Sequence, residues 1–328
     1  MVLRKSIEEQ GERFRENEFV KILPFFFASY PSPNTRQTYQ KAIEEFFNHW
    51  HLKGIPLFQL KELQRFHLET WQRTLESSGR YTPSSICAKM SALVSLCRFL
   101  VENEWIEKNP AAFVKLPRVS KLKGKTQALS QNEIVFLLEK LKGNYLNSPH
   151  PSYKKEHYDA WLTYGIFLTL ATIGMRCSEL VHLKISDFKQ TGVFYRLHLR
   201  LKGGEDHAPL IPHYLSEFIL SYLKNCRSFS QEHHPLFSLE KSQNEPIGRE
   251  YLSKLITKTG EKHGLQTKIS AHSLRATVAS LLHKNNVPVG EIQDLLGHKS
   301  ILTTMMYVRK TDEENESAAL KNPLGKIL

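Results

Sequence analysis

The chain has 328 residues, of which 41% are hydrophobic and 24% are charged, a normal composition for a soluble globular protein with room for two domains. Its 45 Lys and Arg outnumber its 33 Asp and Glu, which gives a formal net charge of +12. Such an excess favours a polyanionic partner, most often nucleic acid and less often an anionic membrane surface, although a merely soluble basic protein has the same composition.

The four cysteines are widely spaced and form no C-x-x-C pair, which argues against a zinc finger and against a redox motif. We interpret them as buried free thiols in a reducing compartment. The polar first residues lack the apolar segment of a signal peptide, and no apolar run approaches the roughly 18 residues of a membrane span. The sequence thus predicts a cytoplasmic protein with no membrane partner.

Residues 1–116 are predicted to form a helical domain. A Ser-Pro-Asn-Thr run at 32–35 supplies the chemistry of a helix start, and apolar side chains then recur at helical spacing over residues 36–51. A second helix is expected over residues 60–79. A Thr-Pro pair opens a third helix that runs to residue 103, with proline suited to the first helical position.

A basic linker is predicted over residues 117–127. The stretch around it, 115–125, has no acidic residue and contains a proline and a glycine. An extended basic segment of this kind can lie against DNA phosphates, and the alternative is a solvated connection between domains. The candidate DNA-binding residues are Lys115, Arg118, Lys121, Lys123 and Lys125.

The second domain, residues 128–328, is predicted to be mostly helical with one small antiparallel sheet. Residues 130–133 fit a capping box, and residues 158–175 form a long buried helix. Alternating side chains over residues 193–201 indicate a strand, which a Lys-Gly-Gly turn returns along residues 207–212 as a hairpin. Further helices are expected at about residues 213–227, 248–263, 271–285, 288–296 and 300–309.

Polar side chains interrupt apolar stretches of this domain. Arg176 follows an apolar run, where a guanidinium is costly unless it is paired or faces a ligand, and Glu179 is the obvious structural partner. His272 and Arg275 lie three residues apart and therefore share a helix face. Lys202 lies at the hairpin turn, a position where most lysines are simply solvated.

Two further residues follow near the end of the chain. His298 comes just after a predicted helix end, where a histidine can cap carbonyl groups, and Tyr307 lies on an amphipathic helix, where a tyrosine is normally part of the core. Each of the six residues has an ordinary structural explanation when taken alone. Together they make the set that phosphoryl transfer without a metal requires.

The chemistry of that set is specific. Arginines bind the non-bridging phosphate oxygens with paired donors, and their charge stabilises the transition state. A tyrosine phenol can attack the phosphorus once neighbouring positive charge and a proton acceptor activate it, because its unperturbed pKa is about 10. A lysine can then protonate the departing sugar hydroxyl.

Five stretches carry a resemblance to a known family. TIGMRCSEL, LKGGEDHAPLIP, AHSLRAT, LLGHKS and TTMMYV closely resemble the motifs of the tyrosine recombinase (phage integrase) family, in that family's order. The strong match covers about residues 128–310, and the organisation is most similar to Xer-type members and compact integrases. The resemblance implies an N-terminal helical core-binding domain followed by a C-terminal catalytic domain.

The resemblance also implies the role of each residue. Arg176 and Arg275 would bind the scissile phosphate, and Tyr307 would attack it to form a 3′-phosphotyrosyl bond. Lys202 would protonate the leaving 5′-hydroxyl, His272 would act as acid or base near the phosphate, and His298 would form a hydrogen bond to it. Strand exchange through a Holliday junction would need neither ATP nor a metal, so no cofactor is expected.

The implied partners are a double-stranded DNA recombination site and other recombinase subunits, in a homo- or hetero-tetramer that includes, in some members, a partner recombinase. Among the departures from the family pattern, Glu205, Asp206 and His207 replace basic residues after the turn, which puts phosphate contacts there in doubt. Residues 145–157 also look like a long loop. Two alternatives stay open, namely a DNA-binding accessory protein without activity and a nicking-closing enzyme of the type IB topoisomerase kind.

Overall fold

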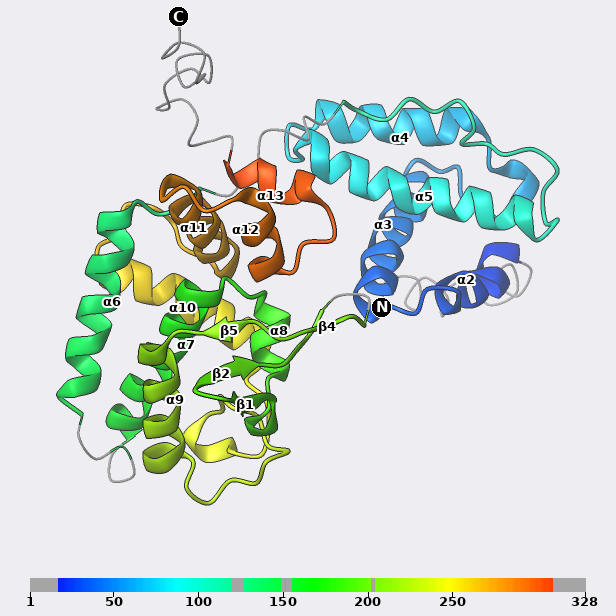
Figure 1. Ribbon diagram of the computed structural model, residues 1–328. Helices are drawn as coiled ribbons and strands as arrows, with labels where there is room; N and C mark the ends of the chain where they lie inside the picture. Colours follow the sequence, from blue (N-terminus) through cyan, green and yellow to red (C-terminus); the bar gives the residue numbers. More distant parts are fainter. Residues whose placement is uncertain (1–16, 119–126, 149–150, 152–154, 202–203, 309–328) are drawn as a thin grey trace, which may run out of the picture. The chain divides into compact units, whose positions relative to one another are not determined.

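The computed structural model divides into two compact units, Met1–Ser120 and Lys121–Leu328, whose elements are labelled in Figure 1. The predicted fold class, mainly α with a small antiparallel sheet, is confirmed. The predicted linker, 117–127, contains the point of division. The part of the chain that the structure describes comprises residues 17–118, 127–148, 151, 155–201 and 204–308, with residues 306–308 described by their backbone alone.

The N-terminal unit is helical, and its two longest helices begin where the sequence predicts. α3 (Pro33–Leu52) starts at Ser32, and α5 (Pro83–Glu102) starts at Thr82. In each case the cap hydroxyl accepts a hydrogen bond from the backbone N–H three residues further on, an interaction worth about 1 kcal/mol. The other elements of this unit are α2 (Glu18–Ala28), a 3-10 turn (Leu60–Glu62) and α4 (Arg65–Ser77).

α2 is a helix that the sequence pattern does not predict, because Pro24 lies in its interior. It forms because Asn17 caps its first turn, accepting the N–H of Phe19 at 3.0 Å. Four of its side chains are then buried in the core, namely Phe19, Ile22, Leu23 and Phe26. Burial on one face therefore outweighs the local cost of the proline.

The single helix predicted over residues 60–79 is wrong in its first turn, where two extended residues separate the 3-10 turn from α4. The Glu62 carboxylate accepts the N–H of Phe58 at 2.8 Å and so closes the 3-10 turn. The ring of His67 accepts the N–H of Gln64 at 3.1 Å and so starts α4. Both side chains offer the backbone an alternative to a continuous helix.

Among the residues that the structure describes, α5 is the one helix whose length and apolar composition would allow it to cross a membrane. The expectation that no apolar run approaches that length is therefore wrong for this helix. Its apolar side chains lie in one buried cluster with Phe46 of α3 and Trp71 of α4, whose rings meet edge to face at 5.4 Å. This packing accounts for the apolar sequence as that of a core helix.

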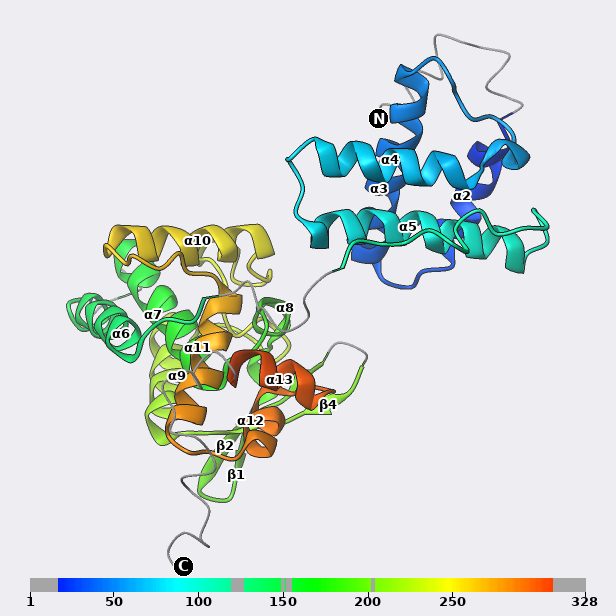
Figure 2. The same cartoon turned by 90° about the horizontal axis from the view of Figure 1, so that it is seen from above.

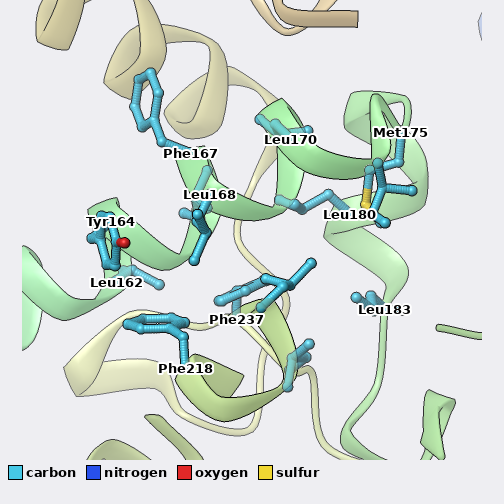
Figure 3. Close-up of a cluster of buried hydrophobic side chains, with 14 of the residues drawn as sticks. Leu162, Tyr164, Phe167, Leu168, Leu170, Met175, Leu180, Leu183, Phe218 and Phe237 are labelled. Atoms are coloured by element: carbon cyan, nitrogen blue, oxygen red, sulfur yellow. The ribbon is translucent and has the colours of Figure 1, made fainter. Parts of the chain in front are cut away.

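The C-terminal unit is built around α7 (Lys155–Ile173), which lies against α6 (Gln131–Leu146), α9 (His213–Cys226) and α11 (Ala271–Lys284) (Figure 2). α7 is buried on nearly all faces, as the sequence predicts. Figure 3 shows Tyr164 of α7 on the side of Phe218, with which its ring meets edge to face, while Phe167 points to the opposite side of α7. This core holds the ends of α7 and its neighbours in fixed positions, and the candidate site lies at one of those ends.

The helices predicted from residue 213 onwards agree with the observed ones to within one residue at each end, whereas α8 (Cys177–His182) is not predicted by the sequence pattern. The predicted capping box is present at the start of α6, where Ser130 N donates to the Glu133 carboxylate at 2.8 Å. The loop predicted over 145–157 is shorter, because α6 extends to Leu146 and α7 begins at Lys155. The helices are α6 (Gln131–Leu146), α8 (Cys177–His182), α9 (His213–Cys226), α10 (Arg249–Lys262), α11 (Ala271–Lys284), α12 (Val289–Leu296) and α13 (Ile301–Val308).

The predicted hairpin is observed, but in two pieces. β2 (Phe194–Leu197) pairs antiparallel with β5 (Leu210–Ile211), and β3 (Leu199–Arg200) pairs with β4 (Asp206–His207). The strand predicted over residues 193–201 breaks at His198, whose N–H bonds to Asp187 O at 2.8 Å instead of to the hairpin partner. β1 (Phe188–Thr191), which the sequence pattern does not predict, adds to β2 to give the order β1-β2-β5.

Candidate active site

The structure brings together four of the six candidate catalytic residues, and they come from three segments of the C-terminal unit. Arg176 lies between α7 and α8, His272 and Arg275 lie on α11, and His298 follows α12. Tyr307 lies on α13, and its backbone alone is described. Lys202 lies outside the described residues.

Arg275 is the most deeply buried of the four, with 2% of its surface exposed. Its Nη1 donates to Gly174 O at 2.8 Å and its Nη2 donates to Leu296 O at 2.7 Å. Its Nε donates to His298 Nε2 at 3.3 Å. Because carbonyl dipoles replace water around the guanidinium, the charge is buried at a tolerable cost and its orientation is fixed.

Two glycines with positive φ make these contacts possible. Gly174 has φ +67°, and a Cβ there would lie 2.6 Å from Leu296 Cδ2. Gly297 has φ +60° and ends α12, and a Cβ there would lie 2.8 Å from Leu201 Cδ1. The left-handed conformation favours glycine at both positions, so the turns before Arg176 and before His298 can approach Arg275 closely.

Arg176 is partly exposed, with its side chain 32% accessible. Its Nη1 donates to Glu179 Oε1 at 2.6 Å, and Glu179 is itself buried and also accepts the backbone N–H of Arg176 at 2.7 Å. Its Nη2 donates to Gly297 O at 3.4 Å. The structural partner suggested by the sequence is therefore present, and it holds a guanidinium that still reaches solvent.

The two guanidiniums converge on the end of α12. Arg275 bonds to Leu296 O, and Arg176 bonds to the next carbonyl, Gly297 O. Two permanent positive charges held this close, with one of them reaching solvent, form a place where an anion is favoured.

His298 is buried, and its protonation state follows from its hydrogen bonds. Arg275 Nε can only donate, so His298 Nε2 accepts and carries no proton. The proton is therefore on Nδ1, which donates to Thr304 Oγ1 at 2.8 Å. Burial, and then Arg275, Arg176 and His272, lower the pKa of His298 to about 3, so the ring is neutral near pH 7.

His272 is exposed and lies in the first turn of α11. Its pKa is lowered by loss of solvation against the protein, and then by the charges of Arg275 and Arg176. A neutral imidazole beside two guanidiniums can accept a proton from a reacting group, which is the chemistry expected of a general base.

The described flanks of the hairpin turn lie against the end of α12. Leu201 packs at Gly297, and His207 Nε2 lies 3.0 Å from Leu295 O. Glu205, one of the residues that depart from the family pattern, forms an ion pair with Lys299 at 2.8 Å. The acidic residue thus contacts the segment that carries His298.

α13, the helix to which Tyr307 belongs, packs on α11 and α12 (Figure 2). The contact between His298 and Thr304 lies one helical turn before Tyr307. Sequence reasoning misses Thr304, because a threonine on an amphipathic helix carries no signal of its own; the only hint is its separation of six residues from His298.

The candidate DNA-binding residues of the linker region are described in part. Lys115 and Arg118 are exposed, whereas Lys121, Lys123 and Lys125 lie outside the described residues. Among the residues that the structure does describe, no group of three or more His, Cys, Asp or Glu side chains is placed to hold a metal ion. The absence of metal and cofactor from the reaction stays a prediction.

Comparisons with known proteins identify the family of this chain. The model of the phage integrase family matches residues 127–314, and that of the phage integrase N-terminal SAM-like domain matches residues 28–104. A tyrosine recombinase XerC of Halalkalibacterium halodurans is 26% identical over 291 residues, which cover 86% of this chain and 88% of that protein. A tyrosine recombinase XerA of Thermococcus onnurineus is 27% identical over 292 residues, covering 88% of this chain and 89% of that one.

Solved structures share the fold. A XerH site-specific recombinase bound to difH substrate, in a pre-cleavage complex, superposes with a TM-score of 0.64 at 20% identity, covering 86% of this chain and 80% of that one. A lambda integrase tetramer bound to a Holliday junction gives a TM-score of 0.65 at 15% identity, covering 91% and 77%. Because the family model spans more than half of the sequence, this chain belongs to the phage integrase family, the tyrosine recombinases that cleave and rejoin DNA in site-specific recombination.

Proposed function

We propose that Arg176, Arg275, His272 and His298 surround the scissile phosphate of a DNA recombination site, and that Tyr307 attacks it. The observation that carries the proposal is the convergence of Arg176 and Arg275 on consecutive carbonyls at the end of α12. Segments separated by about a hundred residues meet there, and α13 packs beside them. Two guanidiniums next to two histidines of lowered pKa fit a phosphodiester better than they fit a neutral substrate.

The proposed step exchanges one phosphoester bond for another. The phenol oxygen of Tyr307 forms a bond to phosphorus while the bond from phosphorus to the 5′ oxygen breaks. The phenol proton passes to His272, and Lys202 supplies the proton that the 5′ oxygen takes up. The 5′-hydroxyl of a partner strand then attacks the phosphotyrosine, which restores the phenol and completes the exchange.

In this proposal the partner is duplex DNA, and the assembly is a tetramer formed with copies of this chain or with a second recombinase, as in the Holliday-junction complex of lambda integrase. Residues 1–116 bind DNA as the core-binding domain, residues 117–127 cross it as a basic linker, and residues 128–328 carry the chemistry. The net charge of +12 supports a polyanionic partner. The protein acts in the cytoplasm.

The test is covalent trapping of the protein on DNA. The recombination site is first located as the sequence that the protein protects from nuclease digestion, and a nicked duplex containing that site is then used as the substrate. The wild-type chain should form a DNA adduct that survives denaturation, because the fragment beyond the nick diffuses away and religation fails. Tyr307→Phe should bind the duplex with nearly unchanged affinity and give no adduct.

An adduct with Tyr307→Phe would show that the nucleophile is another residue. Tight site-specific binding by the wild-type chain with no adduct would favour an accessory DNA-binding protein. Relaxation of a supercoiled plasmid that lacks the site would favour a topoisomerase.

A further inference from the structure

We propose that Thr304 is a positioning residue that lets the ring of His298 change which nitrogen carries the proton when a phosphate enters the site. The proposal rests on the proposed function for the identity of the ligand, but its structural part concerns the protein without DNA. Nothing in the assignment of the six candidate catalytic residues includes Thr304.

The contact itself is well defined. Thr304 has no exposed surface, His298 is 6% exposed, and Thr304 Oγ1 lies 2.8 Å from His298 Nδ1. The backbone of His298 is held as well, because its carbonyl accepts a hydrogen bond from Gln293 Nε2 at 2.8 Å. A buried polar contact of this length between side chains six residues apart fixes the ring plane and ties α13 to the end of α12.

The direction of the hydrogen bonds creates a conflict with the proposed role of His298. In this structure His298 Nε2 accepts from Arg275 Nε, so Nε2 has no proton to give. Phosphate oxygens only accept. If His298 is to contact the scissile phosphate through Nε2, that nitrogen must first gain a proton.

One way to gain it is to form the doubly protonated imidazolium. Burial beside two guanidiniums opposes that route, since both hold the pKa of His298 far below neutrality. The other way keeps the ring neutral: one proton leaves Nδ1, one arrives at Nε2 through solvent, and the net charge is unchanged. Arg275 Nε is then released from the imidazole and can donate to the phosphate.

The second route requires a partner at Nδ1 that works in both states. A hydroxyl meets that requirement, because it accepts while Nδ1 carries a proton and donates after the proton has left. A carboxylate at this position would only accept and would hold the proton on Nδ1, and an aliphatic side chain would leave Nδ1 unsatisfied in a buried site. Threonine therefore suits a ring that changes tautomer, whereas packing alone would be met equally well by valine.

The variants Thr304→Val and Thr304→Ser separate these roles. Valine keeps the shape and removes the hydroxyl, and serine keeps the hydroxyl. Thr303→Val is the matched control, because it makes the same change on the neighbouring residue of α13, whose side chain is not part of the His298 contact. All are compared as full chains, with saturating duplex, by the rate of adduct formation.

We expect Thr304→Val to slow cleavage about tenfold or more, the effect of leaving one buried polar group unsatisfied. DNA binding should change little, and Thr304→Ser and Thr303→Val should stay within about threefold of wild type. Equal rates for Thr304→Val and wild type would overturn the proposal, and so would a serine variant as slow as the valine one.

A second measurement needs no substitution at Thr304 and covers the case in which Thr304→Val fails to fold. The ¹⁵N spectrum of the histidine-labelled Tyr307→Phe chain, which is not expected to cleave, should show the proton of His298 on Nδ1 without DNA and on Nε2 once the duplex is bound. The same tautomer in both states would overturn the proposal. Failure to form any adduct would count against the proposed function instead, while the spectrum of the free chain would still test the Thr304 contact.

Discussion

The C-terminal unit buries two arginines in two different regions, and the comparison shows what marks a candidate catalytic charge. Arg275 on α11 and Arg227 at the end of α9 are both 2% exposed, and both donate to main-chain carbonyls. Arg227 Nη2 bonds to Pro235 O and Gln243 O at 2.7 Å each, and Nη1 bonds to Ser238 Oγ. These acceptors lie in the one loop that follows α9.

The surroundings differ in what the charge can act on. Arg227 closes the loop after α9 beside a buried tyrosine pair, Tyr158 and Tyr222. Arg275 instead joins three segments and lies next to Arg176 and two histidines whose pKa values it lowers. Burial and carbonyl contacts alone therefore describe a structural arginine, and the concentration of further cations around Arg275 is what points to an anionic ligand.

The largest expected effect is a difference in cleavage rate between variants of the two buried arginines. Arg275→Ala should slow cleavage by about 10²–10³, the usual cost of losing one donor to a developing oxyanion. Arg227→Ala should leave cleavage per folded molecule unchanged while it lowers the melting temperature, by about 2–4 °C for each kcal/mol lost. Single-turnover cleavage and thermal unfolding, measured on both variants, check this, and equal cleavage rates for the two variants would remove Arg275 from the site.

A backbone change should have the next largest effect. Gly174→Ala places a Cβ 2.6 Å from Leu296 and 3.3 Å from Val278 at a φ of +67°, so the carbonyl that Arg275 uses must move. Gly192→Ala is the matched control, with φ +61° and no atom within 4 Å of the new Cβ. The control should cost about 1 kcal/mol of unfolding free energy from its backbone alone.

Gly174→Ala should cost more than the control, and it should also lose cleavage activity. Chemical denaturation together with adduct formation makes the comparison. If both alanine variants cleave DNA like the wild type, the approach of this turn to Arg275 has no functional meaning.

The last prediction concerns protonation. The pKa of His298 lies near 3 in the folded chain and near 6.5 in the unfolded chain, so the unfolded chain binds the extra proton between these values. The unfolding free energy should therefore fall as the pH is lowered from about 6.5 towards 3. Removing Arg275 should raise the pKa of His298, whereas removing Arg227 should not. A pH titration of each variant, followed by the ¹⁵N shifts of its histidines, measures this difference.

Much of the helical framework could be predicted from the sequence because its signals are local. The caps at Ser32, Thr82 and Ser130 and the periodicity of α11 lie within a few residues of the elements they define. α2 and β1 could not be predicted in this way. α2 depends on tertiary burial around Pro24, and β1 is a four-residue strand whose pairing with β2 decides its existence.

The candidate site likewise has features that the sequence indicates and features that only the folded chain shows. The sequence singles out Arg176, His272, Arg275 and His298 by residue type and order, and the structure brings them together. It does not indicate their partners, because the carbonyl of Gly174 lies 101 residues from Arg275 and that of Gly297 lies 121 residues from Arg176. Contacts between distant segments carry no local pattern. The contacts of Arg227 and Thr304 span only 6 to 16 residues, but no residue type or periodicity marks them in the sequence.

The central claim is that the guanidinium of Arg275 neutralises charge on one scissile phosphate. The most direct test replaces that phosphate by an uncharged methylphosphonate and measures the cleavage rate of wild type relative to Arg275→Ala on both duplexes. The ratio should shrink strongly on the methylphosphonate, because the charge that Arg275 stabilises is missing, while the ratio for Arg227→Ala should be the same on both. An undiminished ratio for Arg275→Ala would contradict the account.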